Sequence, residues 1–233
     1  MKLKKNNLQI AIDGPVAAGK SIAAYRLAQR LKILYVYTGS MYRAVAWLGL
    51  KNGLDLKKEK PLIRLLRQTE LQLNKPTKKG RVCDVIVNGQ DVTDKLFSQE
   101  IHWGSSLVGV FPKVRSHLVK LQRKIAQGQA VVMEGRDIAS VVLPQADLKI
   151  YMTADLEIRA KRSLKAILAR GEKTSLRKVK EETKKRDYQD THRQADPLQK
   201  VVDAWVLDTT CLTIEEEVEK ILDKLEEKGL IEK

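Results

Sequence analysis

A glycine-rich loop near the start of the chain constrains the fold more than any other feature of the sequence. The loop consists of Gly14, Pro15, Val16, Ala17, Ala18, Gly19, Lys20 and Ser21. It fits the pattern G-x-x-x-x-G-K-[ST], in which glycines let backbone N–H groups curl around phosphate oxygens with no Cβ in the way. In such a loop Lys20 places a positive charge on the β- and γ-phosphates, and the hydroxyl of Ser21 is able to hold Mg²⁺. The loop therefore predicts a phosphate-binding site.

The segments on either side of the loop strengthen this interpretation. The mostly apolar run 8–12 before it is typical of a buried strand. After it, apolar residues recur at the spacing of one helix face: Ala24, Leu27, Ala28 and Leu31. A strand, a glycine loop and a helix are what a phosphate site needs, because the helix N-terminus adds its own donors and dipole. The alternative is a tight strand-to-helix turn with a chance Gly-Lys-Ser.

The composition is typical of a globular protein without a membrane segment. The 233 residues allow one large domain or a core with an insert, and a hydrophobic content of 43% is sufficient for a packed core. There is no run of about 18 apolar residues, and the basic segment 1–7 lacks the apolar core of a signal peptide. The only two cysteines, Cys83 and Cys211, lie far apart and do not have the spacing of metal ligands. We interpret them as ordinary residues of a protein in the reducing cytoplasm. We therefore expect a cytoplasmic protein that does not bind a membrane.

The net charge of +15 permits two interpretations. One is nucleic-acid binding. The other is a lysine-rich, solvated surface on a protein whose ligands are polyanions. Much of the excess lies in helical stretches such as 177–186, which are not interleaved with aromatic residues. We favour the second interpretation, because net charge governs non-specific binding and not the fold.

Short apolar runs alternate with helical patterns along most of the chain, which predicts a parallel sheet. Further strands are expected at residues 33–36, 130–133, 148–152 and 204–208. Thr38 is expected to cap the helix after the second strand. Another helix is expected to begin at Pro112 and to end at Gly128, and a capping box at Thr213 should begin the last helix.

The stretch 69–93 has a different pattern. Residues 70–74 alternate as a half-exposed strand does, and residues 82–87 form a second candidate strand. Asn88-Gly89 after it is a strong hairpin signal. The stretch therefore predicts a small antiparallel insert.

Three polar features lie where a ligand would bind. Glu134-Gly135-Arg136-Asp137 follows a buried strand, and ligands of open α/β sheets bind at the carboxyl ends of strands. The alternative is a polar loop with a local Arg–Asp pair. Arg43 is either a surface residue or a phosphate clamp, because its planar fork matches a phosphate. The charged segment 175–193 is either a solvated face or a mobile lid that brings cations over a phosphate.

These motifs together resemble one family, the bacterial cytidylate kinases, which are CMP kinases among the nucleoside monophosphate kinases. The resemblance covers nearly the whole chain. It is carried by the loop with Ile12-Asp13 before it and by segments 37–43, 111–115, 134–138, 186–193, 197–198 and 206–210. The loop alone is generic. Its combination with Gly-Arg-Asp and the late Arg-Asp-x-x-Asp-x-x-Arg is specific.

The resemblance implies an α/β fold of the P-loop NTPase type, with a five-stranded parallel sheet and helices on both sides. It implies a single kinase unit over 1–233, with a core at 6–60 and 104–233, an antiparallel insert that binds the nucleoside monophosphate at about 61–103, and a lid at about 161–186. It also implies transfer of the γ-phosphoryl group of ATP to CMP or dCMP, with Mg²⁺, giving CDP or dCDP. We expect a monomer that binds no specific nucleic acid.

The resemblance also assigns roles to individual residues. The implied catalytic residues are Lys20, Arg159, Arg162 and Arg186, with Ser21 as the metal ligand. The implied contacts of the acceptor's phosphate and sugar are Arg43, Arg136, Arg186 and Asp190. The implied surroundings of the cytosine are Ser106, Arg115, Asp137 and Arg193, with Thr38 beside the acceptor.

The chain departs from the family pattern at two positions. The family usually has an aspartate before the Thr/Ser-Gly of the second motif, and this chain has Tyr37. A tyrosine can form a hydrogen bond but brings no charge, so the resemblance alone assigns neither a metal role nor an acceptor role to this position. The family usually has a glycine two residues after Gly-Arg-Asp, and this chain has Ala139. Alanine restricts a backbone position that glycine leaves free.

Alternatives stay open at three points. Another small P-loop kinase, acting on UMP or a different small acceptor, would differ only in the acceptor pocket. A nucleotide-dependent RNA- or DNA-binding protein would need aromatic stacking positions in a basic groove, and only 5% of residues are aromatic. Asp137 either accepts from the amino group of cytosine, which uracil lacks, or pairs with Arg136 or Arg193 and holds the loop in shape.

Overall fold

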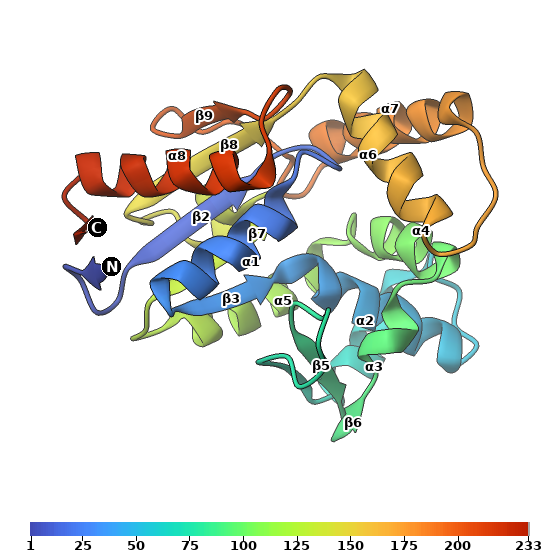
Figure 1. Ribbon diagram of the computed structural model, residues 1–233. Helices are drawn as coiled ribbons and strands as arrows, with labels where there is room; N and C mark the ends of the chain where they lie inside the picture. Colours follow the sequence, from blue (N-terminus) through green and yellow to red (C-terminus); the bar gives the residue numbers. More distant parts are fainter. Residues whose placement is uncertain (233) are drawn as a thin grey trace. The chain divides into compact units, whose positions relative to one another are not determined.

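The computed structural model describes residues 1–232, which separate into two compact units (Figure 1). The first unit comprises residues 1–34 and the chain from Gly128 onward, and the second comprises Tyr35–Gln127. The first unit contains β1 (Lys2–Leu3), β2 (Gln9–Asp13), α1 (Lys20–Leu31), β7 (Val131–Gly135), the π-helical turn η2 (Ile138–Val142), β8 (Leu148–Thr153), α6 (Leu156–Leu168), α7 (Leu176–His192), β9 (Trp205–Asp208), α8 (Ile214–Glu227) and β10 (Ile231–Glu232).

A five-stranded parallel sheet organises the first unit. Its strand order is β3-β7-β2-β8-β9, where β3 (Leu34–Tyr37) is the strand at which the chain passes to the second unit. The central strand β2 pairs with β7 and β8 in parallel, so that Ile10 lies opposite Val132 and Leu148. A strand that is buried on both faces is apolar along its whole length, and a continuous apolar run is easy to recognise in a sequence. The predicted sheet is confirmed, and each strand lies within two residues of its predicted bounds.

The strand order places the glycine-rich loop at a ligand-binding position. The chain passes from β2 to β3 and β7 on one side of the sheet and then to β8 and β9 on the other. In open α/β sheets a ligand binds where the order reverses, at the carboxyl ends of the strands. The loop that follows β2 begins at this point.

Helices α1 and α8 lie side by side in the first unit (Figure 1). The predicted capping box at the start of α8 is confirmed, since Thr213 Oγ1 accepts from the backbone N–H of Glu216 and the Glu216 side chain accepts from that of Thr213. The two-residue strands β1 and β10 pair in antiparallel register, with Leu3 opposite Ile231. Strands of this length are too short to carry a sequence pattern, so the sequence does not predict this pairing.

The second unit is mostly helical, with a small antiparallel sheet. Its elements are α2 (Thr38–Lys51), α3 (Glu59–Arg67), β4 (Leu71–Asn74), β5 (Asp84–Val87), β6 (Gln90–Asp91), the 3-10 helix η1 (Thr93–Leu96), α4 (Gln99–Val108) and α5 (Pro112–Ala126). The sheet has the order β4-β5-β6, and both residues of the β5–β6 turn have positive φ, 49° at Asn88 and 77° at Gly89. The predicted antiparallel strands and hairpin are therefore confirmed.

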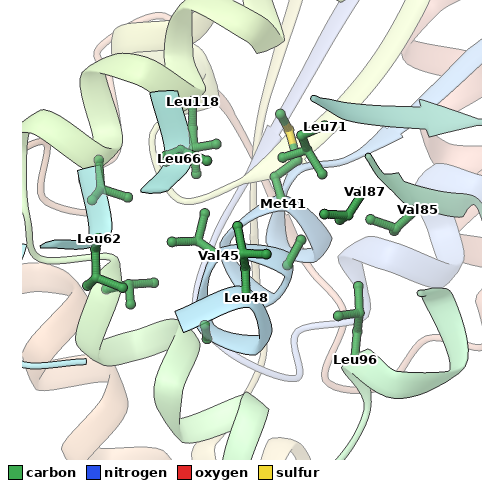
Figure 2. Packing of buried hydrophobic residues seen from close by; sticks show 14 of the residues in the cluster. Met41, Val45, Leu48, Leu62, Leu66, Leu71, Val85, Val87, Leu96 and Leu118 are labelled. Carbon is green, nitrogen blue, oxygen red and sulfur yellow. The ribbon is translucent and has the colours of Figure 1, made fainter. Parts of the chain in front are cut away.

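An apolar cluster holds the sheet and the helices of the second unit together. Figure 2 shows Met41, Val45 and Leu48 of α2 among side chains of α3, the small sheet and α5. Leu118 of α5 is fully buried in this cluster. The apolar positions of α2 recur every three or four residues, so one face of the helix forms the centre of the cluster.

The structure corrects one prediction about local structure and adds two helices. Thr38 does not cap α2; it is the first helical residue, Tyr37 occupies the N-cap position, and no side chain caps the helix there. Helices α3 and α4 were not predicted, because each has only nine or ten residues and borders the stretch of different pattern. Within residues 1–232, none of the helices combines the length and the apolar character that a membrane span requires.

Candidate active site

The loop between β2 and α1 has the backbone of a phosphate cradle. Gly14 has a φ of 149°, and a Cβ at this residue would lie 1.9 Å from the backbone oxygen of Met152 in β8. Only glycine fits there, because such a contact cannot be relieved by moving a side chain. Gly19 occupies the N-cap of α1 in a left-handed conformation, and no side chain caps this helix. The first turn of α1 therefore keeps the donors and dipole that favour an anion.

Lys20 is buried within this loop. Its Nζ donates to the backbone oxygens of Gly14 and Pro15, at 2.8 and 2.6 Å. Burial, followed by the positive charge of Arg136, lowers the pKa of Lys20 to about 7. A polyphosphate in the cradle would reverse this effect, because a negative charge beside an ammonium favours its protonated form.

The hydroxyl of Ser21 and a carboxylate from the next strand lie together. Ser21 Oγ donates to Glu134 Oε1 at 2.9 Å, and Glu134 lies at the end of β7 opposite Ile12 of β2. A hydroxyl and a carboxylate are oxygen donors of the kind that Mg²⁺ prefers. Within residues 1–232 no group of three or more His, Cys, Asp or Glu side chains could hold a metal. The pair therefore fits a Mg²⁺ that takes its remaining ligands from phosphates and water.

Asp13 connects the end of β2 to η2. Its carboxylate accepts from the backbone N–H groups of Ile138 and Ala139 at 2.8 and 2.7 Å. Burial raises the pKa of Asp13 to about 7, although these two hydrogen bonds act in the opposite direction. Ala139 lies in η2 and does not have a positive φ, so an alanine fits here without backbone strain.

Arg136 and Asp190 form a largely buried ion pair. Arg136 Nε donates to Asp190 Oδ2 at 2.7 Å, which links the end of β7 to helix α7. Burial alone would raise the pKa of Asp190, but Arg136 and Arg186 lower it below its usual value. Asp190 is therefore ionised at neutral pH, and it holds Arg136 at the carboxyl end of the sheet.

Arg193 extends this pair into a network of four residues that the sequence had singled out. Its guanidinium lies 3.9 Å from Asp137 Oδ1 and 3.7 Å from Asp190 Oδ1. The side chains of Arg193 and Asp137 are 6% and 7% exposed. Both interpretations of Asp137 are compatible with this arrangement, because an ion pair at 3.9 Å fits either of them.

Arg159 of α6 is held against the glycine-rich loop. Its Nη1 donates to Asp187 Oδ2 at 2.6 Å and to the backbone oxygen of Val16 at 3.2 Å, and its Nε donates to the backbone oxygen of Ala154. The backbone N–H of Val16 in turn donates to Asp187 Oδ1 at 3.4 Å. Asp187 therefore bridges Arg159 and the loop.

Arg162 binds the segment that follows β9 in the first unit. It donates to the hydroxyl and the backbone oxygen of Thr209, just after β9, at 2.9 and 2.7 Å. The Thr209 hydroxyl donates to the backbone oxygen of Ala18 in the loop, so Arg162 reaches the loop through Thr209. Arg186, the third predicted catalytic arginine, lies in α7 one turn before Asp190.

Glu217 of α8 lies behind the loop and is fully buried. Its nearest cation is Arg162, at 3.7 Å, and neither of its oxygens has a hydrogen-bond partner within residues 1–232. A Cβ at Gly19 would lie 3.0 Å from Glu217 Oε2, so the carboxylate packs directly against the loop backbone. Burial raises the pKa of Glu217 to about 7, although Arg162 acts in the opposite direction.

The other four predicted residues belong to the second unit. Thr38 is buried in the first turn of α2, and Arg43 lies farther along that helix. Ser106 lies in α4. Arg115 is fully buried, donates to the backbone oxygen of Gly109 at 3.1 Å, and lies 5.5 Å from the centre of the Tyr42 ring.

Sequence reasoning assigned no role to four residues of the first unit that the structure places around the loop: Glu134, Asp187, Thr209 and Glu217. Glu134 and Asp187 lie within motifs that the sequence identifies. The sequence does not show which residues their carboxylates bind. Glu217 occupies an inward position of an amphipathic helix. An acidic residue at an apolar position is a signal that could have identified it.

The fold and the loop together define the class: this is a P-loop nucleotide-binding protein. The model of one family, described as cytidylate kinase, matches residues 10–227. The chain belongs to the cytidylate kinase family. It is therefore a kinase, and the family supports a nucleoside monophosphate kinase activity.

Curated relatives agree with this assignment over nearly the full length of the chain. A cytidylate kinase of Geobacillus kaustophilus is 46% identical over 224 residues, which cover 96% of this chain and 99% of the relative. One from Streptococcus pneumoniae is 42% identical, with 95% and 98% covered. Among solved structures, an uncharacterized protein from Eubacterium ventriosum covers 94% of this chain and 98% of its own, with a TM-score of 0.50 and 12% identity. That likeness concerns the fold alone.

Proposed function

We propose that this kinase transfers the γ-phosphoryl group of ATP to CMP or dCMP, with Mg²⁺, and releases ADP and CDP or dCDP. The observation that carries the proposal is the complete phosphate loop, with buried Lys20 and the Ser21–Glu134 pair, in a chain that matches the cytidylate kinase family over residues 10–227. The names of the curated relatives support cytidylate as the acceptor.

ATP binding is assigned to the loop. The backbone N–H groups of residues 14–19 and the N-terminus of α1 would surround the phosphates, and the Lys20 ammonium would exchange its two carbonyl partners for phosphate oxygens. Ser21 and Glu134 would hold Mg²⁺ directly or through water. Bound Mg²⁺ supplies neutralisation of charge on the phosphate oxygens.

The transfer step needs positioning and positive charge more than it needs a base. The acceptor is a phosphate oxygen that is already ionised at neutral pH, and the charge that develops is spread over the equatorial oxygens. Arg136 and Arg159 are both fixed by carboxylates, Asp190 and Asp187. Fixed guanidinium groups of this kind stabilise developing charge without reorganisation when the reaction occurs.

The base of the acceptor is assigned to Asp137 and Arg193, which lie together in the first unit. Asp137 is 5% exposed, so a carboxylate oxygen there that faced another oxygen would carry a desolvation cost. Cytosine offers an amino donor that satisfies a carboxylate, and uracil offers an oxygen instead. We therefore assign the discrimination between CMP and UMP to this residue.

An assay of ADP release with a panel of acceptors tests the proposal. Wild-type protein is incubated with ATP, Mg²⁺ and each of CMP, dCMP, UMP, AMP and GMP. We expect the highest kcat/KM with CMP or dCMP. The Lys20→Ala variant, purified in parallel, gives the background from contaminating kinases. A kcat/KM that is highest with UMP would replace this proposal with the second candidate, another acceptor on the same fold.

A further inference from the structure

Arg43 of α2 has aromatic neighbours and, within residues 1–232, no acidic partner. Its guanidinium carbon lies 5.5 Å from the centre of the Tyr37 ring and 5.3 Å from the centre of the Phe97 ring. One of its terminal nitrogens lies 3.4 Å from His102 Nδ1. Within residues 1–232 it forms no ion pair with a carboxylate. Its charge is therefore not neutralised by the second unit itself.

The contacts with the two rings restrict Arg43 without using up its hydrogen bonds. A cation within about 6 Å of a ring centre is attracted by the negative face of the ring. This attraction limits the conformations of a long side chain that would otherwise lose entropy on binding a ligand. The N–H donors of a guanidinium lie in its plane, so an arginine held by ring faces can still bind an anion through two of them.

Gly39 has no side chain, and the Tyr37 ring occupies the space beside it. A Cβ at Gly39 would lie 2.9 Å from Tyr37 Cε2 and 3.4 Å from its Cζ, so the ring occupies space that any other residue at position 39 would take. The backbone of Tyr37 is fixed as well, because its carbonyl oxygen accepts from Ser40 Oγ at 2.7 Å. The tyrosine therefore folds back over the first turn of α2, toward Arg43.

Phe97 is 42% exposed, but the residues before and after it in the chain are both held in place. Leu96 before it is buried in the apolar cluster of the second unit. Ser98 after it caps α4, since its Oγ accepts from the backbone N–H of Ile101. An exposed phenylalanine on such a fixed backbone contributes little to the core. Its contact with Arg43 gives it a different role.

We propose that Tyr37 and Phe97 are positioning residues that hold the Arg43 guanidinium ready for the phosphate of the acceptor nucleotide. This inference rests on the proposed function only in the identity of the acceptor. The two rings act through Arg43, and their effect should be specific to the acceptor and absent for ATP. It also gives a reason for a tyrosine at position 37: a neutral ring orients the arginine and leaves its positive charge available.

The test compares leucine variants of the two rings, because leucine keeps apolar bulk but removes the ring face. For Tyr37→Leu and Phe97→Leu we expect the KM for the acceptor to rise about two- to fivefold each, the range that corresponds to one exposed cation–π contact. The KM for ATP should stay unchanged. Tyr37→Phe keeps a ring and should restore the acceptor KM to within about twofold of wild type.

A matched control removes cation–π contacts elsewhere on the same helix. The Trp47 ring lies 5.0 Å from Lys51 Nζ and 5.7 Å from Lys95 Nζ, and within residues 1–232 the cation–π contacts of Arg43 are with Tyr37 and Phe97 instead. Trp47→Leu should leave the acceptor KM unchanged, and thermal melting of every variant identifies those that fail to fold. Phe97 is exposed, so Phe97→Leu should fold even if a change at Tyr37 disturbs α2.

A double-variant cycle decides whether the rings act through Arg43. In an Arg43→Ala background, the Leu substitutions should have no further effect on the acceptor KM. An unchanged effect in that background, or an equal rise in the KM for ATP, would overturn the inference. The kinetics use whichever nucleoside monophosphate is the best acceptor in the panel. If CMP is not that acceptor, the proposed function fails while the role of the rings is still tested.

Discussion

The buried carboxylate of Glu217 should make the stability of the first unit depend on pH. Folding raises the pKa of this group from 4.5 to about 7, because burial disfavours the ionised form. A carboxyl whose pKa is higher in the folded state binds a proton more tightly there, so its contribution falls as pH rises. The contribution is complete below about pH 4.5, declines between pH 4.5 and 7, and is lost above the folded pKa.

The size of the pKa shift of Glu217 determines how strongly the free energy of unfolding depends on pH. Each pKa unit corresponds to about 1.4 kcal/mol, so a shift from 4.5 to about 7 gives roughly 3 kcal/mol between pH 4.5 and pH 8. Glu217→Gln replaces the carboxyl by an amide of similar shape that does not titrate. We therefore expect the variant to gain about 3 kcal/mol of stability relative to wild type when the pH is raised from 4.5 to 8.

Urea unfolding of both proteins across this pH range measures the difference directly. Other titrating groups are common to wild type and variant and cancel in it. Glu219→Gln is the matched control, because Glu219 lies on the same helix but forms an exposed ion pair with Arg30. Its effect should stay within about 1 kcal/mol at every pH. A difference between wild type and Glu217→Gln that is the same at pH 4.5 and pH 8 would refute the reasoning.

Three further predictions concern the active site. Lys20→Ala should lower kcat by about a hundred- to a thousandfold, by analogy with the loss of one donor to developing charge, while circular dichroism stays unchanged; near-wild-type turnover would contradict the role of the loop. Asp137→Ala should bring the ratio of kcat/KM for CMP to that for UMP toward one, whereas an equal loss on both substrates would make Asp137 structural. Amide hydrogen exchange in residues 161–186 should slow when a bisubstrate analogue binds, because the like charges of this segment repel until polyphosphate enters, and equal exchange in both states would exclude a lid.

The local patterns of the sequence were enough to locate the sheet and the loop. A strand buried on both faces is apolar along its whole length, and the turn after β2 can be formed only by glycine at position 14. Both signals act within a few residues, so they are visible without knowledge of the fold. The capping box at Thr213 and the Asn88-Gly89 turn are local in the same sense.

The partners of the charged residues were decided by the tertiary structure. Asp187 follows Arg186 in the chain, yet it binds Arg159 and the backbone of Val16, more than 170 residues away. The sequence identifies such residues as charged but cannot say which charges meet, because an ion pair depends on the packing of separate elements. The burial of Glu217 and the contact of Arg43 with the Phe97 ring have the same origin. They arise only where α8 packs against α1, and where η1 and α4 hold Phe97 close to α2.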